Sequence, residues 1–223
     1  MLSNVQRTLG RLRHPDVERR QKALSRIEKR ARRGLSDEEV REIVAFASAD
    51  LPPKKYELGS YDESLLRSVQ AHLRPSHVEA LVARFEHVTP AARSTILWNL
   101  ASIDDVSAAR AWASLLQHHG WPEVSYPALI RPFEESRRHG DVILMPLVDG
   151  SIQDVPEDML LLLLLAYGAE EKIPPDVLAL AVPRVVARGR ALVAEAREFQ
   201  QRGGTAWRYA DEYAEVRIDT GLV

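Results

Sequence analysis

Apolar residues recur every three or four positions along most of the chain, which predicts helix almost throughout. The clearest stripe follows Pro15 and consists of Val17, Leu24, Ile27 and Ala31. A proline is harmless in the first turn of a helix, because the amide that it lacks has no partner there. Aromatic residues make up only 6% of the chain and β-branched residues rarely cluster, which weighs against a sheet. We therefore predict an all-α protein.

Capping residues and prolines mark where the predicted helices begin. Ser36, followed three positions later by Glu39, forms the pattern of a capping box, and Asp62 is predicted to cap a helix that ends near His72. Thr89 before Pro90 predicts the start of another helix. Successive helix pairs are expected at a period of roughly 30 to 37 residues. Such a period is typical of helical-hairpin solenoids, in which no pair buries its apolar face alone. The pairs begin near Pro75, Asp104, Asp141 and Pro175.

The predicted architecture is one helical-repeat domain over residues 1–202, followed by a C-terminal extension over residues 203–223, where the composition changes. The longest irregular connection is expected over residues 49–61, and Gly140 is expected to end a helix. The leucine run Leu160–Leu165 covers every side of its helix, which favours either a central core position or a dimer seam. The sequence leaves both a monomer and a homodimer open.

Two segments resemble the second helix of a HEAT repeat, namely residues 15–27 (PDVERRQKALSRI) and 90–100 (PAARSTILWNL). The resemblance extends over about residues 14–190 and implies a right-handed α-solenoid of stacked antiparallel helix pairs. It places Arg20 and Arg93 at the position whose arginine ties neighbouring repeats together. Arg93 falls on the apolar side of its helix, so its guanidinium needs an acidic or carbonyl partner.

The net charge of −2 hides a strong asymmetry. Residues 1–34 carry eleven Lys or Arg and three acids, a net of +8, so the remaining residues sum to −10. The basic helix over residues 15–33 would suit phosphates or an acidic protein, although a solvated capping repeat would show the same charges. The cations that we single out as partner-binding candidates are Arg19, Lys22, Arg26, Arg30 and Arg33.

Three aromatic residues are further candidates for partner contact. Trp98 points nearly opposite the apolar face of its predicted helix, so it either anchors a partner or packs on a neighbouring helix. Trp121 and Tyr126 lie in the predicted loop over residues 120–127, where they either contact a partner or anchor the loop.

The sequence offers no positive case for a reaction. It contains no cysteine, no Gly-rich phosphate loop and no nucleophile motif, and the adjacent His118 and His119 point about 100° apart on a helix. We therefore predict no metal, no cofactor and a non-enzymatic protein. The rival interpretation is a HEAT-like DNA glycosylase, a class that resembles this chain in length and helix-pair construction. Its candidate set would be Trp98 with Asp104 or Asp105.

The leading hypothesis is a scaffold that binds another protein, acidic on its contact surface, with nucleic acid as the alternative partner. A bacterial toxin-neutralising or assembly role would fit. The first ten residues are polar and lack the apolar core of a secretion signal. The longest apolar run spans eight residues, where a bilayer crossing needs about 20. We expect no membrane span and a cytoplasmic location.

Overall fold

The computed structural model describes residues 3–54, 59–122, 132–133, 136, 138–168 and 173–201. These residues form helices joined by turns and contain no strand, which confirms the predicted all-α class. The chain divides into two compact units, Met1–Val177 and Leu178–Val223, which are described separately. No helix within the described ranges is both long enough and apolar enough to cross a bilayer. The predicted boundary at residues 202/203 lies at the end of the described part and stays a prediction.

The first unit contains short α-helices with single-turn 3₁₀ helices between some of them. The 3₁₀ helices are η1 (Arg11–Arg13), η2 (Gln70–His72), η3 (Pro75–His77) and η4 (Phe85–His87). The α-helices are α1 (Asn4–Gly10), α2 (Val17–Arg33), α3 (Asp37–Phe46), α4 (Tyr61–Val69), α5 (Val78–Arg84), α6 (Pro90–Ser102), α7 (Val106–His119), α9 (Gly140–Val148) and α10 (Glu157–Gly168).

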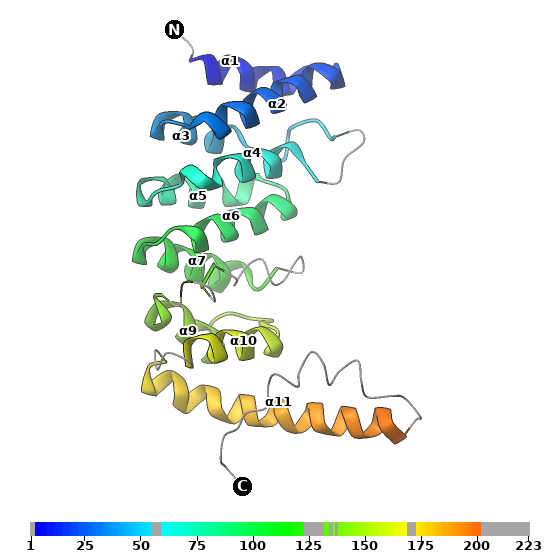
Figure 1. The fold of residues 1–223 in the computed structure, drawn as a ribbon, viewed down its shortest axis with the longest axis vertical. Coiled ribbons are helices and arrows are strands. Elements are labelled where there is room, and N and C mark those ends of the chain that lie inside the picture. Colours follow the sequence, from blue (N-terminus) through cyan, green and yellow to red (C-terminus); the bar gives the residue numbers. More distant parts are fainter. Residues whose placement is uncertain are drawn as a thin grey trace. The chain divides into compact units, whose positions relative to one another are not determined.

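Alternate helices of the first unit pack on one another. The even-numbered helices form one row, α2 on α4 and α4 on α6, and the odd-numbered helices form another, α3 on α5, α5 on α7 and α7 on α9. Figure 1 shows these helices stacked in sequence order, with α1 beside α2. The predicted apolar stripes supply the core, since Leu24, Ile27, Ile96, Leu97 and Leu100 are all buried. Burying each of these side chains contributes about 1.5 to 3 kcal/mol.

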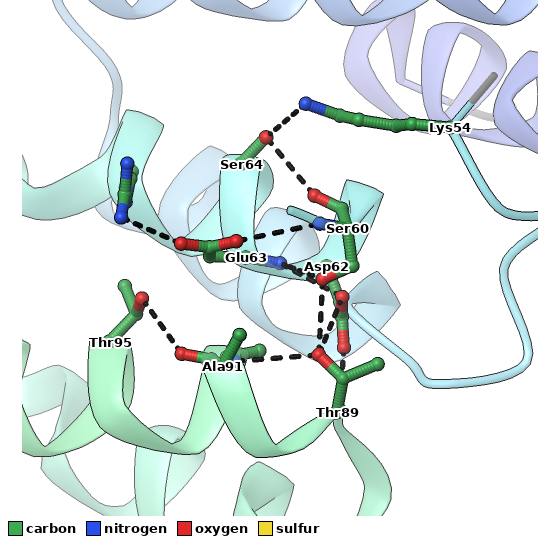
Figure 2. Close-up of polar contacts among 10 residues, drawn as sticks. Lys54, Ser60, Asp62, Glu63, Ser64, Thr89, Ala91 and Thr95 are labelled. Atoms are coloured by element: carbon green, nitrogen blue, oxygen red, sulfur yellow. Dashed lines mark hydrogen bonds and ion pairs between the residues drawn. The ribbon is translucent and has the colours of Figure 1, made fainter. Parts of the chain in front are cut away.

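Most predicted helix starts are confirmed, with one error at α4. Thr89 caps α6 and Ser36 caps α3 in a capping box with Glu39. The cap of α4 is Ser60 instead of Asp62, because Ser60 forms its own capping box with Glu63. Asp62 instead lies buried in the first turn and bonds Thr89 at the start of α6, as Figure 2 shows.

The prediction that Gly140 ends a helix is wrong, because Gly140 is the first residue of α9. The residue before it, His139, adopts the left-handed conformation with φ of 57° and so takes the position usually given to glycine. Within α10 the leucine run is mostly core, since Leu160, Leu163 and Leu164 are buried while Leu165 is exposed.

The described part of the second unit belongs to a single long helix, α11 (Pro175–Gln201), which contains Pro183 and begins within the first unit. Much of this helix is solvent-exposed, including aliphatic side chains. Those with more than a third of their surface exposed are Leu178, Leu180, Val182, Val186 and Val193. The short helix expected near residues 207–215 lies outside the described residues.

Candidate functional site

A groove of about 510 Å³ lies between α1 and α2, with α3 beneath it. We call it the basic groove. Residues spaced i, i+3, i+4 and i+7 share one side of a helix, and both walls are built on this spacing. It is lined by Asn4, Val5, Arg7, Thr8 and Arg11 around α1, by Arg26, Ile27, Lys29, Arg30 and Arg33 of α2, and by Glu39 and Ile43 of α3.

One aliphatic residue from each of the three helices forms the floor of the basic groove. Val5, Ile27 and Ile43 are all buried there, with exposed fractions of 7%, 3% and 0%. The start of α1 is also tied to α3, because the Ser3 hydroxyl donates to the Glu42 carboxylate over 2.7 Å. The two walls are therefore held on a shared apolar base.

Five cations of the basic groove have no partner within the part of the chain that the structure describes. Each side chain is exposed, and no described carboxylate, carbonyl or ring lies within bonding distance of its charged group. Long charged side chains of one sign along two walls raise the local concentration of anions. These five are Arg7, Arg11, Arg26, Lys29 and Arg33.

The sixth cation of the basic groove, Arg30, is held by Glu39. Its Nε and Nη2 atoms donate to the two carboxylate oxygens, each over 3.0 Å. This bond raises the pKa of Arg30, and the Arg30 guanidinium together with the Ser36 amide lowers the pKa of Glu39. Glu39 is the one acid among the residues that line the groove. The pair leaves the positive charge of the other five uncompensated.

The structure gathers three of the predicted partner-binding cations and leaves two outside the groove. Arg26, Arg30 and Arg33 line the basic groove. Lys22 lies on an adjoining surface of α2 that it shares with Arg26. Arg19 turns to the start of α2, where it lies 3.8 Å from the Asp16 carboxylate and 3.1 Å from His14 Nε2.

The predicted aromatic candidates lie away from the basic groove. Trp98 of α6 is half-buried, and its indole N–H has no acceptor among the described residues. Trp121 is only 9% exposed and packs edge-on against Trp112, with ring centres 6.3 Å apart. It therefore anchors the chain after α7. Tyr126 lies outside the described residues.

Sequence reasoning missed the α1 wall of the basic groove. Arg7 of α1 and Arg11, the first residue of η1, are four residues apart and both line the groove. A signal was present, because their spacing places both on one face of a helix whose buried stripe includes Val5 and Leu9. The apolar stripe of α1 does not determine which helix packs beside that face.

The carboxylates considered for a glycosylase have structural partners. Asp105 caps α7 and accepts hydrogen bonds from the hydroxyl and backbone amide of Ser107, which lower its pKa. Asp104 pairs with Arg138 and lies 3.6 Å from His139 Nε2. No three acidic or histidine side chains within the described ranges are placed to hold a metal ion.

Comparison of the chain with protein-family models, with curated proteins and with solved structures finds no match.

Proposed function

We propose that the chain is a HEAT-like helical-repeat protein that binds an acidic segment of another protein in the basic groove. The observation that carries this proposal is the set of five exposed cations without partners along the groove. Carboxylates of a partner would supply the missing counter-charges, and arginine binds a carboxylate through two parallel hydrogen bonds. The proposed role is that of a non-enzymatic interaction module.

Two features support an α-solenoid of stacked helix pairs as its architecture, for which the HEAT resemblance implies a right hand. The first is the packing of alternate helices into two rows, which stacked helix pairs produce. The second is that both arginines at the HEAT position donate hydrogen bonds to backbone carbonyls. Arg20 donates to the carbonyls of His14 and Pro15 and reaches the Pro53 carbonyl at 3.5 Å, while Arg93 donates to the Phe85 carbonyl over 3.2 Å.

A protein partner is favoured over nucleic acid by the lining and by the rest of the chain. Single-stranded nucleic acids need aromatic side chains for stacking, and the residues that line the basic groove include none. The methylene stems of the arginines above the buried floor offer apolar contact to a side chain, which a phosphate backbone does not supply. Beyond residue 34 the chain carries a net charge of −10, which would repel a long polyanion.

The test compares two labelled polyanions on the full chain by fluorescence anisotropy, between about 50 and 200 mM salt. The probes are a poly-glutamate peptide and a DNA duplex. We expect the peptide to bind, and binding to weaken as salt rises. The double variant Arg26→Glu/Arg33→Glu should abolish it. The matched control is Arg19→Glu/Arg32→Glu, which makes the same charge change at two exposed positions of α2 outside the groove.

Three results would count against the proposal. Failure of the poly-glutamate peptide to bind would overturn it. Equal losses in the two double variants would show that net charge alone drives binding, without a groove. Tighter binding of the duplex than of the peptide, lost with Arg26→Glu/Arg33→Glu, would establish the nucleic-acid alternative instead.

A further inference from the structure

We infer that the basic groove takes its acidic partner as an α-helix, which lies along α1 and α2 with its carboxylates towards both walls. This inference rests on the proposed function and specifies the conformation and residue pattern of the ligand. It goes beyond charge attraction, because it predicts that two ligands of the same charge bind differently.

The cations of each wall follow the spacing of a helix. Arg26, Lys29 and Arg33 lie at i, i+3 and i+7 on α2, and Arg7 and Arg11 lie at i and i+4 on the α1 side. With a rise of about 1.5 Å per residue, the α2 row is roughly 10.5 Å long and the α1 row roughly 6 Å. A partner helix alongside repeats its acids at these same intervals, so successive turns meet successive cations.

The polar lining of the groove is rich in hydrogen-bond donors. Arg and Lys side chains donate and cannot accept. The Glu39 carboxylate already accepts from Arg30 and from the Ser36 amide. An extended peptide would bring backbone N–H groups that find few acceptors there, whereas a helix bonds its own backbone internally. A helical ligand therefore loses the least hydrogen bonding on entry.

The floor adds an apolar requirement. The methylene stems of the arginines form the apolar surface between the two cation rows, above the buried side chains of Val5, Ile27 and Ile43. A helix with two acidic flanks and a narrow stripe of alanine or leucine between them would meet both features at once. The ligand class is thus an amphipathic acidic helix.

The experiment uses two labelled peptides of identical composition, with two rows of Glu on either side of an alanine stripe, each row at i, i+4 and i+7, and one proline each. In one peptide the proline occupies the first helical position, where it is tolerated. In the other it stands at the centre, where it breaks the helix. We expect the first to bind the full chain at least about tenfold more tightly, since a central proline removes a backbone hydrogen bond and breaks the helix. The far-ultraviolet circular dichroism of the mixture should show a gain of helix over the separate components.

A variant tests whether both walls take part. Arg7→Glu/Arg11→Glu changes only exposed positions and should remove most of the preference for the helical peptide, while the control Arg19→Glu/Arg32→Glu should keep it. An unchanged preference in Arg7→Glu/Arg11→Glu would overturn the two-walled placement. Equal affinity of the two peptides would overturn the helical ligand and leave the proposed function standing. Failure of both peptides and of poly-glutamate to bind would overturn the proposed function itself.

Discussion

The carboxylate of Asp62 accepts hydrogen bonds from both the backbone amide and the hydroxyl of Thr89, over 2.7 and 3.2 Å. Thr89 caps α6, and its hydroxyl lies 3.0 Å from that of Ser60, which caps α4. Figure 2 shows how the starts of these two packed helices meet at this point. One buried side chain therefore fixes where α4 and α6 begin relative to each other.

Replacing Asp62 by alanine should destabilise the fold strongly. Asp62 is 1% exposed, and its removal leaves the part-buried Thr89 amide without its acceptor and the Thr89 hydroxyl with Ser60 alone. We expect the free energy of unfolding to fall by about 2 to 3 kcal/mol, measured by urea denaturation. Glu38→Ala, at an exposed acid in the first turn of α3, should cost less than about 1 kcal/mol. Equal losses in the two variants would refute the structural role of Asp62.

The two arginines of the HEAT-like segments should differ in their contribution to stability. Arg20 is 7% exposed and donates hydrogen bonds to three carbonyls. The Arg93 side chain is 35% exposed, so water can bond its carbonyl acceptor when the guanidinium is removed. We expect Arg20→Leu to lower the free energy of unfolding by about 3 kcal/mol and Arg93→Leu by about 1 kcal/mol. The same denaturation series measures both. A larger loss in Arg93→Leu would contradict this ranking.

The stability of the chain should depend on pH through His77. This residue is fully buried, its Nδ1 accepts from the Arg74 amide over 3.0 Å, and its Nε2 lies 3.3 Å from the Asp37 carbonyl. Burial lowers the pKa of His77, and the hydrogen bond to Asp37 only partly opposes this shift. The unfolded chain therefore takes up the proton first as the pH falls.

It follows that the contribution of His77 is fully present above about pH 6.5 and is lost as the pH falls towards the lower pKa of the folded state. The urea midpoint of the native chain should drop between about pH 7.5 and 5.5, and it should drop less in His77→Gln. The two proteins differ only at this residue, so the difference between the two profiles isolates His77. Parallel profiles would show that His77 does not titrate differently on folding.

Glu39 should act as an internal competitor of the partner. Glu39→Gln removes the negative charge that holds Arg30, while a glutamine at this position can keep the capping box with Ser36. We expect the affinity for an acidic helical peptide to rise about fivefold, equivalent to roughly 1 kcal/mol, with a smaller loss of stability. Anisotropy titrations of the two proteins measure the change. A weaker affinity would mean that Glu39 positions Arg30 for binding instead of occupying it.

Helix starts were predictable where one capping residue stood alone. Thr89 before Pro90 gave the start of α6, and Ser36 with Glu39 gave that of α3. The prediction failed at α4, where Ser60 and Asp62 both suit a cap. Ser60 forms the capping box with Glu63, and Asp62 bonds Thr89 at the start of α6 instead. It failed again at Gly140, because the backbone of His139 takes the left-handed conformation that sequence rules reserve for glycine.

The α2 side of the basic groove could be predicted from the sequence, and the α1 side could not. The charges of α2 are a local property of the sequence, and Arg26, Arg30 and Arg33 follow from helical spacing alone. The place of Arg7 and Arg11 in the groove depends on how α1 packs against α2 and α3. The spacing of the apolar residues does not determine that packing. The burial of Trp121 likewise depends on Trp112 beside it, a tertiary contact.

The packing of each helix of the first unit on helices next or next but one in the sequence also bears on how the chain folds. Such short-range contacts give a low contact order, and we expect refolding of this unit to be fast for its size. Among the described helices, we expect opening to start at α1. At the N-terminal end, α1 makes its main contacts with α2, α3 and η1, while the cations around it repel those of α2. A ligand seated between them would act as a clamp against fraying, so amide exchange in α1 should slow when the groove is filled.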